Sequence, residues 1–261
     1  MLRKLYLFEL KASAQYFIAL FAAILVMSVI NSISLNLTQN APAWVQGLLL
    51  FIQWLLISAT SIVALVVIIR RFSKNLLGQE GYLMFTLPVS THHNILAKLL
   101  AGMTWSLACS LIYIVSIFIV TLSLPEFFEA LELFAHFLRS YDIPPTLIFL
   151  QIAVVSLLGM AGSILLIYLA LAFGQIFNER KSLAATLFYI GAVIVLYTIF
   201  TIIAVSLSIS FPDRLLAWLE GLSPFGISQV IFFVILAITL VLSAICYFFT
   251  HRLLHNKLNL S

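Results

Sequence analysis

Residues 48–69 read LLLFIQWLLISATSIVALVVII, and this run ends directly before the basic pair Arg70 and Arg71. The run holds no charged side chain, and about 20 consecutive apolar residues are enough for a helix to cross the hydrocarbon of a bilayer. The whole chain of 261 residues is 64% hydrophobic and only 8% charged. So much apolar surface cannot be hidden in one water-soluble core. The sequence therefore predicts an all-α membrane protein.

Five other runs along the chain have the same apolar character. Together with residues 48–69 they predict six transmembrane helices, which form a single membrane domain over residues 1–261. The predicted spans are residues 16–35, 48–69, 99–124, 146–173, 183–211 and 225–249. Prolines fall at or beyond the ends of these runs, where helices begin or stop. These prolines are Pro42, Pro125, Pro144, Pro145, Pro212 and Pro224.

The basic residues gather on one side of the predicted spans, as the positive-inside rule describes for short loops. With a cytoplasmic N-terminus, only Arg139 and Arg214 face the outside. Orientation in a bilayer therefore explains the formal net charge of +4 without a nucleic-acid partner. We expect both termini in the cytoplasm and a multi-pass location in a cell membrane, the plasma membrane of a bacterium. The cytoplasmic basic residues are Arg3, Lys4, Lys11, Arg70, Arg71, Lys74, Lys98, Arg180, Lys181, Arg252 and Lys257.

None of the six predicted spans contains Lys, Arg, Asp or Glu. Ionisable groups inside a membrane mark ion sites and proton relays, so their absence disfavours an ion-coupled pump. The chain also lacks a G-x-x-x-x-G-K-[S/T] phosphate loop, so it cannot bind ATP in the usual way. His92 and His93 are adjacent and would point apart on a helix, with no Cys, Asp or Glu at ligand spacing. We expect no catalytic residue, no metal site and no enzymatic activity in this chain.

The loop at residues 70–98 joins the second and third spans and contains a short apolar segment. Residues 82–86 follow Gly81 and end before Pro88, which predicts a helix of about two turns. Its aromatic and aliphatic side chains need either a protein partner or the lipid surface. In the first case the helix docks in a protein groove, and in the second it lies among the headgroups. Glu80 favours docking, because a carboxylate is unfavourable beside an anionic leaflet.

The same loop resembles the intracellular coupling segment of ABC-2 type transporter permeases. The resemblance is closest to a group of compact bacterial six-span permeases. It is carried by four motifs, which are Arg71-Phe72-Ser73-Lys74-Asn75-Leu76, Glu80-Gly81-Tyr82-Leu83, Thr86-Leu87-Pro88-Val89 and, after these, Lys98-Leu99-Leu100. These motifs cover about 30 residues, and the six-span layout extends the likeness along the whole chain.

The resemblance implies a short cytoplasmic coupling helix that inserts into a groove on a separate ABC ATPase subunit. ATP and Mg would be bound by that subunit, with no cofactor in this chain. A second permease, identical or paralogous, would complete the transporter, and membrane lipid would surround it. Residues 2–10 match the amphipathic elbow helix that such permeases carry before the first span. The implied interface residues are Glu80, Gly81, Tyr82, Leu83, Phe85, Thr86 and Pro88.

The expected function is that of the transmembrane permease subunit of an ATP-binding cassette exporter. ATP hydrolysis by the partner would drive efflux of an amphipathic substrate, such as a peptide, a lipid-like molecule or a drug. Two alternatives stay open. One is an ion-coupled secondary transporter or channel, which predicts transport by this chain alone. The other is a non-transporting sensor or immunity protein built on a permease-like scaffold.

Polar residues on two spans are candidates for a substrate path. Gln46, Gln53 and Thr60 recur at intervals of seven on the second span, with Trp54 beside them. The fifth span offers Tyr197 and Thr201. In the family that the chain resembles, the pathway lies between the two permeases along such helices. The alternative role of these side chains is ordinary hydrogen bonding between helices.

Two further patterns concern helices outside the candidate path. Residues 125–139 carry glutamates on one face and apolar side chains on another, which predicts an amphipathic helix on the outer surface. Gly159 and Ser163 form a small-x-x-x-small pattern in the fourth span. This pattern predicts close packing of that span against a neighbouring helix.

Overall fold

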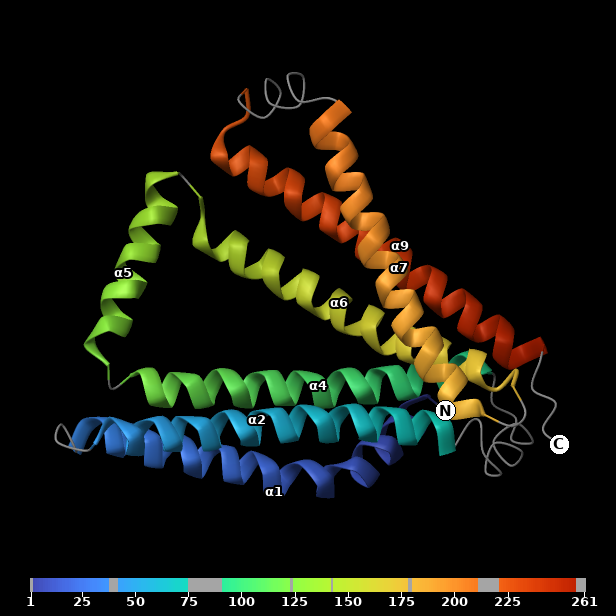
Figure 1. Ribbon diagram of the computed structural model, residues 1–261, viewed down its shortest axis with the longest axis horizontal. Coiled ribbons are helices and arrows are strands. Elements are labelled where there is room, and N and C mark those ends of the chain that lie inside the picture. Colours follow the sequence, from blue (N-terminus) through green and yellow to red (C-terminus); the bar gives the residue numbers. More distant parts are fainter. Residues whose placement is uncertain are drawn as a thin grey trace. The chain divides into compact units, whose positions relative to one another are not determined.

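The computed structural model describes residues 2–37, 42–74, 91–122, 124–141, 143–177, 180–210 and 221–256, and Figure 1 shows their arrangement along the chain. These residues form seven α-helices and no β-strand. The helices are α1 (Leu2–Leu37), α2 (Ala43–Phe72), α4 (Thr91–Thr121), α5 (Pro125–Ser140), α6 (Pro145–Gly174), α7 (Lys181–Ser210) and α9 (Pro224–Asn256).

Six of these helices, all except α5, are long and apolar enough to cross a membrane. This finding confirms the predicted class of helical, multi-pass membrane protein. Several helices extend beyond the predicted spans: α4, for example, begins at Thr91 rather than near residue 99. A helix of 30 residues is about 45 Å long, whereas the hydrocarbon is about 30 Å thick. The turns outside the predicted spans carry polar residues, such as Lys98 of α4, that do not belong to the apolar runs.

The chain divides into two compact units, Met1–Ala135 and His136–Ser261. In the N-terminal unit α1 packs against both α4 and α2, and α2 also contacts α4, as the neighbouring blue, cyan and green helices of Figure 1 show. In the C-terminal unit α6 packs against α9 and α7. Each unit is thus built on three long helices.

The centre of the N-terminal unit is a small aromatic and apolar core. The rings of Phe17 and Trp105 stack with their centroids 4.5 Å apart and their planes within 9°. Phe17 of α1 is buried together with Ala64 of α2 and Cys109 of α4, and Trp105 packs against this cluster. Dispersion between closely packed side chains is what holds helices together where lipid is as apolar as the protein.

Helix α1 continues without interruption through the segment predicted to be a separate elbow helix. In Figure 1 its blue ribbon changes direction near the N-terminal end. Within this part of the helix, the hydroxyl of Ser13 donates a hydrogen bond of 2.9 Å to the carbonyl of Glu9. Such bonds to the preceding turn of a helix commonly bend it.

Close helix approach in the C-terminal unit occurs at Gly162 and Gly174. A Cβ atom at Gly162 would lie 2.8 Å from Ser243 Oγ of α9, and one at Gly174 would lie 2.5 Å from the carbonyl oxygen of Lys181. By contrast, a Cβ at Gly159 would meet no atom within 4 Å, and Ser163 is exposed. The structure therefore shows no close contact at Gly159, and the close approach of α6 to α9 is at Gly162 instead.

Candidate functional site

The candidate coupling segment leaves the described helices after Lys74 and returns at Thr91. Its seven predicted interface residues, Glu80, Gly81, Tyr82, Leu83, Phe85, Thr86 and Pro88, lie outside the described residues. What the structure does describe is the base of this segment, at the end of α2 and the start of α4.

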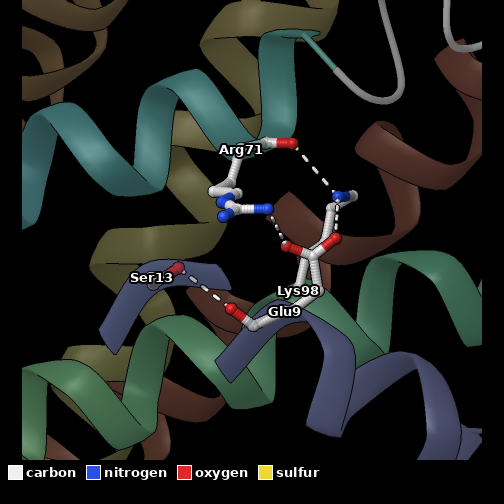
Figure 2. A network of polar contacts seen from close by, with 4 residues as sticks. All are labelled: Glu9, Ser13, Arg71 and Lys98. Carbon is white, nitrogen blue, oxygen red and sulfur yellow. Dashed lines mark hydrogen bonds and ion pairs between the residues drawn. The ribbon is translucent and has the colours of Figure 1, made fainter. Parts of the chain in front are cut away.

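A buried ionic network joins that base to α1. Lys98 of α4 donates a hydrogen bond of 2.6 Å from Nζ to Oε1 of Glu9 on α1. The guanidinium of Arg71, in the last turn of α2, lies 3.6 Å from the other carboxylate oxygen of Glu9. Lys98 Nζ also donates to the backbone carbonyl of Arg71 at 3.0 Å. Figure 2 shows the resulting closed arrangement, in which each of the three residues contacts the other two.

The network is withdrawn from solvent. The side chains of Lys98 and Glu9 are only 2% and 4% exposed, while that of Arg71 is 24% exposed. Taking ions out of water is costly, so such a pair persists only when its partners and hydrogen bonds are all in place. The network therefore favours one relative position of α1, α2 and α4.

A second polar contact joins the same part of α1 to α4. The hydroxyl oxygens of Tyr6 and Thr104 are 2.9 Å apart. Because Thr104 donates its own proton to the carbonyl of Leu100 at 2.8 Å, Tyr6 is the donor in this contact. The N-terminal turns of α1 are thus attached to α4 at two levels, by Tyr6 and by Glu9.

Sequence reasoning placed Glu9 in a surface helix and counted Lys98 only as one more cytoplasmic cation. The available signal was weak: Glu9 is the one carboxylate in the basic N-terminal segment. A lone acid among several cations can pair with any of them, so the partner could not be identified without the positions of the helices.

The candidate path residues of α2 face different directions. Gln53 is buried, and its Nε2 donates to the hydroxyls of Ser28 on α1, at 3.0 Å, and Ser116 on α4. Thr60 is completely buried and donates to the carbonyl of Leu56 in its own helix. Gln46 is half-buried, whereas Trp54 is 67% exposed. Interhelical hydrogen bonding, the alternative role, describes the contacts of Gln53 in this structure.

Asn31 extends the polar cluster around Gln53. Its Nδ2 donates to Gln53 Oε1 at 3.4 Å, and the hydroxyl of Ser28 donates to Ser116 Oγ at 2.8 Å. Asn31, Ser28 and Ser116 are all buried. Polar groups in the middle of such a unit need partners, because a lost hydrogen bond there cannot be replaced by water.

The other two path candidates, Tyr197 and Thr201, lie on α7 in the C-terminal unit. Tyr197 is 73% exposed, and Thr201 is also exposed. The hydroxyl of Thr201 donates to the carbonyl of Tyr197 at 2.9 Å. Their side chains therefore face outward from the unit and are available to lipid, a second chain or a substrate.

Within the described ranges, no three His, Cys, Asp or Glu side chains come together as a metal-binding group. Comparisons of the chain with protein-family models, with curated proteins and with solved structures give no significant match. The fold and the site described above define the class of the protein as a multi-pass helical membrane protein in which a buried ionic network joins α1, α2 and α4.

Proposed function

We propose that this chain is the transmembrane permease subunit of an ABC-2 type exporter. The observation that carries the proposal is the position of the Glu9, Arg71 and Lys98 network. It joins the last turn of α2, at Arg71, to Lys98 about two turns into α4, and it attaches both helices to α1 on either side of residues 75–90. The motifs of that loop resemble the coupling segment of ABC-2 permeases.

A coupling segment has to move helices, and it can do so only if its base is stiff. A force on residues 75–90 reaches α2 at Arg71 and α4 at Lys98. Since both residues contact Glu9, α1 is displaced with them rather than left behind. Buried ion pairs suit this role because their geometry is discrete and a partial displacement leaves charges uncompensated.

In this proposal Glu80 to Pro88 form the cytoplasmic coupling helix and enter a groove on an ABC ATPase subunit. That subunit binds ATP and Mg, and a second permease, identical or paralogous, completes the pathway for an amphipathic substrate. The N-terminal turns of α1 serve as the elbow at the inner surface of the plasma membrane. The bond between Tyr6 and Thr104 supports this placement, because it holds those turns against α4.

The test is co-purification of the full chain with a candidate ABC ATPase subunit, sought among the products of neighbouring genes. A Glu80→Ala, Tyr82→Ala double variant should lose the ATPase while keeping the thermal stability of the parent. Glu129→Ala is the matched control, since Glu129 is an exposed carboxylate on α5, far along the chain from the loop. Full retention of the ATPase by the double variant would sink the docking proposal. Transport driven by an ion gradient in liposomes holding only this chain would replace it with the secondary-transporter alternative.

A further inference from the structure

A groove of about 510 Å³ lies where α6 ends and α7 begins. It is within the range of volumes that bind small ligands. The residues that line it are apolar or aromatic, with one exception, the cation Arg180. They are Phe173, Phe177, Arg180, Leu183, Ala184, Leu187 and Phe188.

Three aromatic rings give the groove a well-packed wall. Phe173 and Phe188 stack with centroids 4.3 Å apart, and the ring of Phe177 lies 5.8 Å from that of Phe173. Gly174 allows this arrangement, because a side chain there would collide with Lys181 and Ala185 of α7. The wall therefore belongs to a close helix junction, which fixes its shape.

Two cations are adjacent in the chain where α7 begins, and one of them, Arg180, lines the groove. Arg180 is exposed and has no ion-pair partner among the described residues, and Lys181 is the first residue of α7. The first turn of α7 contains no acidic side chain. Because the N-terminus of a helix already carries partial positive charge, two cations there are unfavourable unless an anion is nearby. Glu179 precedes them in the sequence and lies outside the described residues.

We propose that this groove binds an anionic phospholipid. An acyl chain lies along Phe173, Leu187 and Phe188, and the phosphate is held by Arg180 and Lys181 where α7 begins. A lipid fits better than an acidic peptide, because the groove lies at the end of two membrane-length helices and its wall is almost entirely apolar. The distribution of basic residues puts this end at the cytoplasmic leaflet, where anionic lipids concentrate. The proposal does not depend on the transport function.

The first experiment measures lipid retention by the purified full chain. The chain is reconstituted with phosphatidylglycerol and phosphatidylcholine of identical acyl chains, and bound lipid is counted by native mass spectrometry. We expect selective retention of phosphatidylglycerol, weakened about tenfold or more in an Arg180→Ala, Lys181→Ala double variant. Arg252→Ala is the matched control, since Arg252 is an exposed cation near the end of α9 in the same unit. It should retain phosphatidylglycerol as the parent does.

A second variant tests the apolar part of the groove with both cations intact. Leu187→Trp fills the groove, and it should also weaken retention of phosphatidylglycerol. If Leu187→Trp binds the lipid normally while inorganic phosphate displaces it, the site is a plain anion site and the proposal is overturned. Equal retention by the parent and by the double cation variant would overturn it as well. A monodisperse profile in size-exclusion chromatography shows that each variant is folded.

Discussion

At the scale of single residues, Glu9 has the largest consequence. Its carboxylate receives Lys98 on one oxygen and Arg71 on the other, and the three residues come from three different helices. The energetics of such a buried group are asymmetric. Removing one partner strands the charge of the other, whereas replacing the whole set with apolar residues is often tolerated.

We therefore expect Glu9→Gln to destabilise the chain by about 3–5 kcal/mol, because the ammonium of Lys98 stays buried without its anion. Thermal unfolding in detergent measures the change. Glu129→Gln, an exposed carboxylate of α5, is the control and should have no measurable effect. A Glu9→Gln, Lys98→Met double variant should recover much of the lost stability. If the double variant is the less stable of the two, the ion pair is not the origin of the effect.

Gln53 gives a prediction that separates a packing role from a pathway role. Its amide donates to Ser116, so Gln53→Leu and Ser116→Ala should be coupled. In membrane proteins such interhelical bonds contribute about 0.6 kcal/mol on average and at most about 1.7 kcal/mol. A double-mutant cycle on unfolding in mixed micelles measures the coupling. Zero coupling, combined with altered substrate transport by Gln53→Leu, would instead favour the path.

At the scale of helices, the strictest steric requirements lie where two helices meet. Gly174 is the tightest point that the described glycines reveal, since an added Cβ would meet the backbone of Lys181 at 2.5 Å and Ala185 Cβ at 2.8 Å. Neither obstacle is the end of a flexible side chain. The start of α7 would have to move away from α6.

Gly174→Ala should therefore lower the stability of the chain by about 1–3 kcal/mol, the usual cost of overpacking. Gly191→Ala is the matched control on α7, because a Cβ there meets no atom within 4 Å. It should be neutral or stabilising by up to about 1 kcal/mol through helix propensity. Both changes are read from thermal unfolding in the same detergent. A stable Gly174→Ala protein would contradict the close approach of α6 and α7.

The sequence predicted the helices well, but it predicted poorly which helices contact one another. Long apolar runs predict spans because a bilayer demands them, and the described residues form six such helices. Which side of a helix faces another helix is not encoded in the same way, since lipid and protein interiors are equally apolar. Gly159 and Gly162 lie one turn apart in α6, and only the second meets another helix.

At the scale of the whole molecule, the predicted orientation has a direct test in labelling. Both native thiols, Cys109 and Cys246, are buried and should be inert to a membrane-impermeant maleimide. Ser140→Cys, at the exposed end of α5, should react in intact cells, whereas Lys181→Cys should react only after permeabilisation. The reverse pattern would invert the assigned topology. A Cys-less parent provides the background.

The base of the candidate site illustrates what one sequence leaves out. Arg71 and Lys98 were both assigned to the cytoplasmic border by their charge. Their common contact with Glu9 depends on three helices that are distant in the chain. Hydropathy indicates how deep a residue lies in the membrane. It does not indicate in which direction around the helix its side chain points, and so not which helix it meets.

The contact of Lys98 with Arg71 also closes the chain into a ring around residues 72–97. Bringing the ends of that segment together costs conformational entropy, and this cost is met when the bundle folds. A protein that binds the segment therefore does not have to offset it. Under the proposed function, loosening the ring at Glu9 should therefore weaken ATPase binding, although Glu9 lies outside the proposed coupling helix. In this view the ionic network is a device of preorganisation, which sets the affinity of a loop by holding its two ends together.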